Sequence, residues 1–69
     1  MIYEKIKDYM KRNKISQKYL TEKTGISEAA ISEMLNGKRK IEINEYLDIC
    51  NAINVHYSFF IDSNPKETA

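Results

Sequence analysis

The chain has 69 residues, a formal net charge of +1 and 42% hydrophobic residues, which predicts one small folded domain and excludes a disordered tail. Its single cysteine excludes an internal disulfide, no Cys/His cluster has the spacing of a zinc site, and no apolar run reaches the roughly 18 residues of a membrane span. With no signal-peptide pattern at its start, the sequence favours the reducing cytoplasm as its compartment.

Charge is distributed unevenly along the chain. Residues 1–40 carry a net charge of +5, and residues 41–69 carry a net charge of −4. This asymmetry predicts one basic and one acidic pole, and the basic pole suits a polyanion such as nucleic acid. The alternative is that these charges only solvate helix surfaces.

The first predicted helix spans residues 2–13, where Ile2, Ile6 and Met10 recur at helical spacing between Lys, Asp and Glu residues. Asn13 is expected to end this helix in the left-handed conformation, which asparagine tolerates better than most residues. The apolar face is short, so it suits a protein core better than a membrane surface.

Two short helices are predicted on either side of Gly25, over residues 17–24 and 28–36. Ser16 and Ser27 stand where these helices begin, and a serine oxygen there can accept the free backbone N–H groups of the first turn. Gly25 can take the left-handed conformation that turns the chain between the helices. The pattern predicts a helix-turn-helix, whose second helix can be offered to the DNA major groove.

The second half of the chain begins with three consecutive cations at residues 38–40. A fourth helix is predicted over residues 44–53, and Asn54 is expected to end it in the left-handed conformation. With a fifth short segment, the fold class is all-α, a compact five-helix bundle. The domain is expected to span residues 1–62, and a flexible tail to follow over residues 63–69.

The fifth segment holds four large apolar side chains within five positions, which one short helix cannot bury together. Tyr57 and Phe60 are three residues apart and are predicted to close the bundle. Phe59 and Ile61 then remain for a partner subunit. The alternative is an irregular end that buries all four.

Cap, turn and core residues keep a single register through most of the chain: Ser16-Gln17, Leu20, Lys23-Thr24-Gly25-Ile26-Ser27, Ala30-Ile31-Ser32, Asn36-Gly37-Lys38-Arg39 and Asn54-Val55. This register resembles that of the phage repressor and Cro-type (XRE-like) helix-turn-helix family over roughly residues 3–61. The resemblance implies a lambda-repressor-like bundle whose second and third helices form the helix-turn-helix. It also implies a transcriptional regulator that binds double-stranded DNA as a homodimer at an inverted-repeat operator, with repression as the typical mode.

The resemblance further implies which residues contact DNA. Base readout falls to the exposed face at the start of the third helix: Ser27, Glu28, Ala29, Ser32 and Glu33. Phosphate contacts fall to polar and basic residues on both sides of that helix: Lys14, Gln17, Lys18, Asn36, Lys38, Arg39 and Lys40. Positions 28, 29, 32 and 33 share one side of a helix, opposite Ile31 and Met34.

Two carboxylates, Glu28 and Glu33, depart from what a reading helix would be expected to carry. A glutamate can accept a hydrogen bond from the cytosine amino group, but near phosphates it is repelled. Glu28 could instead have a purely structural role, because an acidic residue stabilises a helix N-terminus. In the fourth helix, Glu42 replaces the serine or threonine cap of many relatives, and Asn44 could cap instead.

Leu35 is a further surplus apolar residue, at a position that is usually polar in relatives. It is predicted to extend a dimer contact with Phe59 and Ile61, or else to pack beneath Ile41 and Ile43.

The sequence predicts no enzyme, metal or cofactor. It has no catalytic triad, phosphate-binding glycine loop or metal-ligand spacing, while Cys50 lies on the inner stripe of a helix and His56 stands alone. The rival interpretation is a protein-interaction module on the same scaffold, such as an antitoxin-like or anti-repressor subunit with a protein partner. Nine lysines and ten isoleucines suggest an A·T-rich bacterial or prophage genome.

Overall fold

The computed structural model describes residues 1–61, which form four helices and no strand. The helices are α1 (Ile2–Arg12), α2 (Gln17–Thr24), α3 (Glu28–Leu35) and α4 (Ile43–Ala52). The all-α class is confirmed, whereas the five-helix count is wrong. The predicted tail over residues 63–69, and the last residue of the predicted domain, lie outside the described residues.

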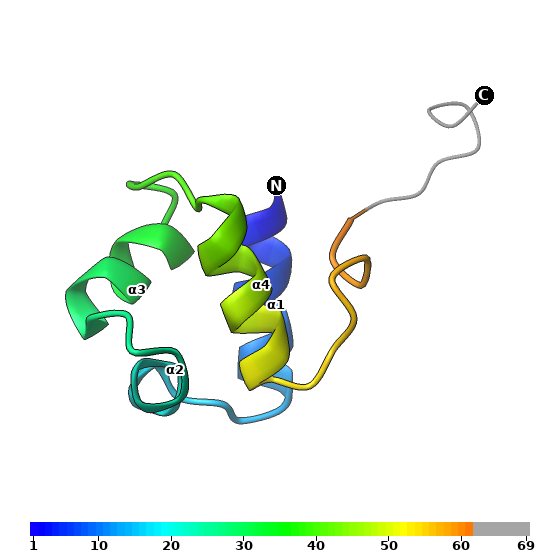
Figure 1. The fold of residues 1–69 in the computed structure, drawn as a ribbon. Helices are drawn as coiled ribbons and strands as arrows, with labels where there is room; N and C mark the ends of the chain where they lie inside the picture. The colour runs from blue at the N-terminus through cyan, green and yellow to red at the C-terminus, as the bar shows by residue number, and fades with distance from the viewer. Residues whose placement is uncertain (62–69) are drawn as a thin grey trace.

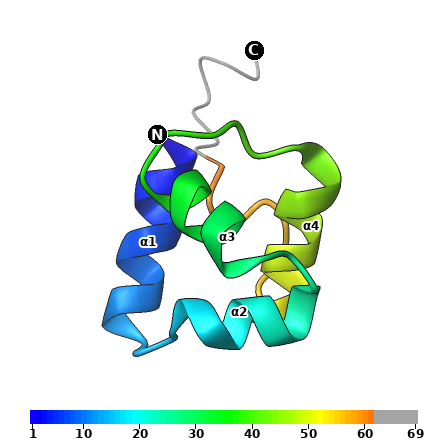
Figure 2. The same ribbon diagram turned by 90° about the vertical axis from the view of Figure 1, so that its left-hand side faces the viewer.

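The four helices surround one core. Figure 2 shows α3 in front, with α1 and α4 to its two sides and α2 beneath it. Packing follows this arrangement, since α2 contacts α3 and α4, and α1 contacts α3. The side chains with the least exposure fill the centre: Ile6, Leu20, Ile31, Met34, Leu35, Ile49 and Cys50. Each helix contributes to this set, so the helix-turn-helix is held by α1 and α4 together.

Serine caps begin the two middle helices as predicted. The Ser16 hydroxyl accepts the Tyr19 N–H at 3.0 Å, and the Ser27 hydroxyl accepts the Ala30 N–H at 3.1 Å. Each cap satisfies a backbone donor that has no partner within its helix.

Helix α4 begins differently from the prediction. Asn44 cannot cap it, because the helix already starts at Ile43 and Asn44 lies within its first turn. Glu42 is the cap residue instead, and its backbone N–H donates to Glu45 Oε1 at 2.9 Å. This reciprocal use of the third helical residue is the capping-box arrangement.

Three helices end in the same Schellman motif, in which the residue after the C-cap is left-handed. These residues are Lys14 (φ 56°), Gly37 (φ 72°) and Asn54 (φ 65°). Asn54 was predicted correctly, but the prediction for Asn13 was wrong, because Asn13 has φ −101° and the conformation passes to Lys14. The closing backbone bonds run from Ile15 N–H to Met10 O (2.8 Å), from Lys38 N–H to Glu33 O (2.9 Å) and from Val55 N–H to Cys50 O (3.0 Å).

The segment after α4 is a pair of turns and no fifth helix. Its backbone bonds join Phe59 N–H to His56 O at 2.9 Å and Ile61 N–H to Ser58 O at 3.1 Å. Phe60 is buried as predicted, with 3% of its surface exposed. The prediction that Tyr57 closes the bundle was wrong, because 54% of Tyr57 is exposed.

Tyr46 explains why the Tyr57 ring faces outward. The Tyr46 hydroxyl donates to the Tyr57 carbonyl, so the backbone of Tyr57 faces the core. Burial, with a smaller contribution from the Cys50 side chain, raises the pKa of Tyr46 to about 12. Burial also raises the pKa of the Cys50 thiol, which packs as a small hydrophobic residue as predicted.

Candidate nucleic-acid interface

The turn between α2 and α3 is built by Gly25 and Thr24. Gly25 has φ 79°, and its N–H donates to Thr21 O at 2.9 Å. The Thr24 hydroxyl accepts the Ile26 N–H at 3.1 Å and donates to Leu20 O at 2.7 Å, which joins the turn to the end of α2. Apart from Gly25 itself and its two chain neighbours, no atom lies within 4 Å of the position of a Cβ at Gly25, so only the backbone conformation requires glycine there.

Helix α3 has one buried and one open face. Its core side is formed by Ala30, Ile31, Met34 and Leu35. The residues predicted for base readout lie on the other side: Ser27, Glu28, Ala29 and Glu33 are exposed, and Ser32 is half-buried. Figures 1 and 2 show α3 at the outside of the molecule, so this face is open to a large ligand.

The residues predicted for phosphate contact fall into two groups on opposite sides of α3. The turn cluster lies at the start of α2 and consists of Lys14, Gln17 and Lys18. The loop cluster joins α3 to α4 and consists of Asn36, Lys38, Arg39 and Lys40. Figure 2 shows the α1–α2 turn below α3 and the α3–α4 loop above it. All of these residues are exposed except the half-buried Gln17.

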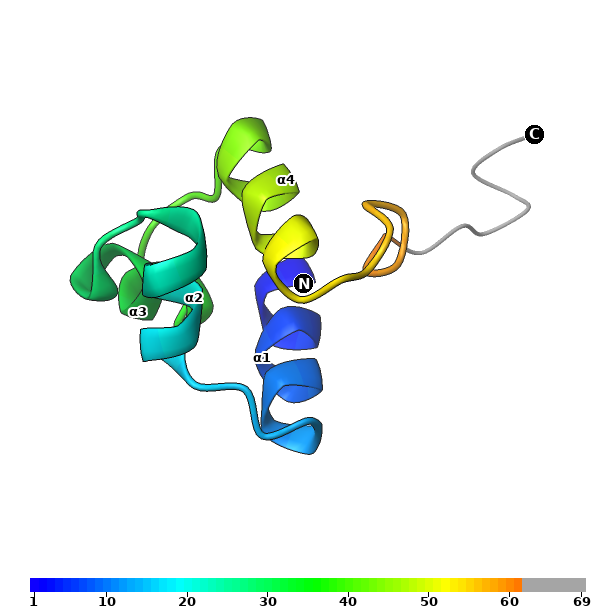
Figure 3. The ribbon, with the colours of Figure 1, turned by 60° about the horizontal axis from the view of Figure 1, so that its bottom comes forward.

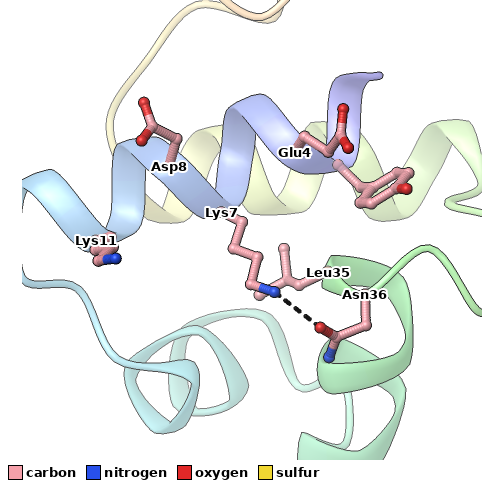
Figure 4. A pocket seen from close by; sticks show the side chains of 7 residues that line it. Glu4, Lys7, Asp8, Lys11, Leu35 and Asn36 are labelled. Atoms are coloured by element: carbon pink, nitrogen blue, oxygen red, sulfur yellow. Dashed lines mark hydrogen bonds between the residues drawn. The ribbon is translucent and has the colours of Figure 1, made fainter.

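Lys7 is a basic residue of this face that the sequence interpretation missed. Its Nζ donates to Asn36 Oδ1 at 2.8 Å, across a pocket of about 330 Å³ between α1 and the end of α3 (Figure 4). Lys11 lines the same pocket. The spacing of four between Lys7 and Lys11 places both on one face of α1, and this periodicity could have indicated them.

Within the loop cluster, Arg39 is already paired. Its Nη2 lies 3.0 Å from Glu45 Oε2, in the first turn of α4. Neither Lys38 nor Lys40 has an ion-pair partner among residues 1–61. In the free protein, Lys38 and Lys40 are therefore available to a ligand, whereas Arg39 is already bound to Glu45.

Glu28 and Glu33 also lack ion-pair partners in the described part of the chain. Glu28 is the first residue of α3, where a carboxylate stabilises the positive end of the helix dipole. Glu33 is exposed one turn further along. Two carboxylates therefore stand on the face between the basic clusters.

The set of residues predicted for a subunit contact needs one correction. Leu35 is only 2% exposed and belongs to the core, so it offers no surface to a second subunit. Phe59 and Ile61 are 57% and 45% exposed. Figures 1 and 3 show their segment on the side of α1 and α4 away from α3.

An exposed helix that follows a tight glycine turn, with basic segments at both of its sides, defines a helix-turn-helix protein. A helix-turn-helix family model of the XRE type matches residues 6–60, and the chain belongs to this Cro- and repressor-like family of DNA-binding regulators. Comparison with curated proteins and with solved structures finds no match. Over residues 1–61, no helix is long and apolar enough to cross a membrane.

Proposed function

We propose that residues 1–62 form a sequence-specific regulator of transcription that binds double-stranded DNA as a homodimer and represses by covering promoter sequence. The observation that carries this proposal is the open face of α3 between two basic clusters. Helix α3 lies in the major groove, and the clusters hold the phosphates on its two sides. The composition of the whole chain, with nine lysines and ten isoleucines, suits an A·T-rich bacterial or prophage genome.

Affinity comes from the phosphate contacts. The turn cluster contributes Lys14, Lys18 and the N-terminal backbone of α2 at Gln17, where the helix dipole favours an anion. The loop cluster contributes on the other side of the groove. Lys7 and Lys11 add two cations on α1 next to this cluster, in a pocket that Glu4 and Asp8 also line, and Lys7 already reaches the end of α3. Release of counterions from these phosphates makes the binding sensitive to salt.

Specificity comes from α3. Ala29 is small, exposed and apolar, and it can contact a thymine methyl group. Glu28 can accept from a cytosine amino group. Carboxylates also repel DNA wherever no donor faces them, so Glu28 and Glu33 penalise wrong sites more than they stabilise the right one.

Lys14 allows a test in which binding and stability change in opposite directions. Its left-handed backbone is strained for lysine and suits asparagine, so Lys14→Asn should stabilise the fold by about 0.5–1 kcal/mol. The same change should weaken duplex binding and reduce the slope of log K against log salt by about 0.9. Fluorescence anisotropy with a 30-base-pair duplex and thermal melting measure the two effects.

The matched control is Lys23→Asn, which removes the same charge outside both clusters, where Lys23 Nζ lies 5.7 Å from the centre of the Tyr19 ring. It should change the salt slope less than Lys14→Asn does. Absence of salt-sensitive duplex binding by the unaltered protein would refute the proposed function.

The dimer contact is proposed at Phe59 and Ile61. The Phe59 ring packs edge-on against Tyr9 at 5.3 Å and Phe60 at 5.0 Å, which fixes an apolar surface although most of Phe59 stays exposed. Because α3 lies on the other side of the molecule, pairing through this segment leaves the reading face of both subunits uncovered.

Phe59→Ser should shift the protein from dimer to monomer in sedimentation equilibrium, because it removes the central apolar group of this surface. Leu47→Ser, which changes an apolar residue of α4 that is 40% exposed, should leave the dimer intact. A dimer constant unaffected by Phe59→Ser would place the subunit contact elsewhere.

A groove supports the second candidate, a protein-interaction module. It has a volume of about 850 Å³ and runs between the start of α1 and the α3–α4 loop. Three exposed isoleucines line it: Ile2, Ile43 and Ile61. Co-purification of a stoichiometric foreign protein, together with no duplex binding at low salt, would favour this candidate.

A further inference from the structure

Glu45 holds Arg39 in the free protein, in the way that a DNA phosphate would hold it. We propose that Glu45 is an internal competitor of DNA for Arg39 and thereby lowers the affinity of the loop cluster for the phosphate backbone. This inference rests on the proposed function. The inference gives Glu45, a residue of α4 outside the helix-turn-helix, an influence on DNA affinity.

The Glu45 carboxylate is fixed at both of its oxygens. Oε2 lies 3.0 Å from Arg39 Nη2, and Oε1 accepts the backbone N–H of Glu42 at 2.9 Å. The second bond ties the side chain to the start of α4, and the Glu45 side chain is only 15% exposed. Glu45 therefore cannot follow Arg39 when that side chain moves.

Arg39 is the more exposed partner, with 41% of its side chain accessible to solvent. A guanidinium binds carboxylate and phosphate with the same charge-assisted hydrogen bonds, so the two acceptors are alternatives for it. A phosphate that reaches Arg39 must either displace Glu45 or share the guanidinium with it. Both outcomes leave a carboxylate beside the DNA backbone and cost affinity.

The two neighbouring cations show the contrast. Lys38 and Lys40 are exposed and lack ion-pair partners in the described chain, so they meet phosphate without losing an internal contact. Arg39, in contrast, has the Glu45 carboxylate opposite its guanidinium. The loop therefore carries three cations but presents two of them unopposed.

Glu45→Gln removes the charge while an amide oxygen can still accept the Glu42 N–H, so the start of α4 is preserved. With Arg39 released, the affinity for a random-sequence 30-base-pair duplex at low salt should rise about tenfold, and the salt slope should steepen by about 0.9. Anisotropy titrations over a series of KCl concentrations measure both quantities.

Glu42→Gln is the matched control, because it removes a carboxylate at the same helix start without touching the Arg39 pair. Its effect should be clearly smaller than that of Glu45→Gln. In an Arg39→Ala background the advantage of Glu45→Gln over Glu42→Gln should vanish, since no guanidinium remains to be released. Equal effects of the two glutamine variants would mean that only the loss of a negative charge matters and not the pairing with Arg39, and this would overturn the inference.

A measurement on the unaltered protein covers the case in which Glu45→Gln fails to fold. The side-chain N–H signals of Arg39 in NMR spectra should shift when the duplex is added, because the guanidinium exchanges carboxylate for phosphate. Unchanged Arg39 signals in the presence of bound duplex would overturn the inference and leave the proposed function standing. Absence of any duplex binding would refute the proposed function and, with it, the inference.

Discussion

Replacing Ala29 by glutamate should reduce binding to the specific duplex by at least about 100-fold, equivalent to about 2.7 kcal/mol. Ala29 is exposed in the first turn of α3, next to Glu28 on the open face of that helix. In the proposed complex a third carboxylate there would face a polyanion and would add bulk on the open face of α3. The operator is first selected from a random duplex pool with the unaltered protein, and the variant is then compared on that sequence.

Ala29→Gln separates size from charge, because its side chain has nearly the same shape as that of glutamate. It should lose less affinity and change the preferred sequence, since an amide can bond to adenine. Both variants should melt within a few degrees of the unaltered protein, because position 29 is exposed in the first turn of a helix. Equal operator affinity of Ala29→Glu and the unaltered protein would exclude α3 as the reading helix.

Gly37→Ala should destabilise the fold by about 2–3 kcal/mol, a large part of the stability of a domain of this size. Gly37 has φ 72°, which alanine adopts at a cost of about 1 kcal/mol. A Cβ at Gly37 would also lie 2.6 Å from Tyr3 Cζ, so the half-buried tyrosine ring must move away. The melting temperature should fall by about 10–20 °C.

Gly25→Ala supplies the comparison, because Gly25 shares the left-handed conformation but has open space where the Cβ would be. It should cost only about 1 kcal/mol. In a Tyr3→Ala background the cost of Gly37→Ala should fall to that of Gly25→Ala. Similar costs for the two glycine substitutions in the unaltered background would show that Tyr3 moves aside freely and would contradict the prediction.

Local rules predicted much of this molecule. Serine caps, the Gly25 turn and helical spacing depend on residues within four or five positions of one another, and the sequence contains all of them. The same spacing separated the open face of α3, with Glu28 and Ala29, from its core face. The errors at helix ends were small, such as the shift of the left-handed residue from Asn13 to Lys14.

Tertiary contacts decided which side chains are paired or buried. They join residues of different elements, and the spacing of such residues in the chain does not predict that they meet. Lys7 bonds to Asn36 from another helix, and Leu35 is buried by the elements that pack over α3. Arg39 is held by Glu45 only because the loop folds back onto the start of α4. The sequence by itself therefore determined the helix-turn-helix and the open face of α3, because these depend on residues close together in the chain. Packing between separate segments decided which basic residues are paired within the protein, because those contacts form only in the folded chain.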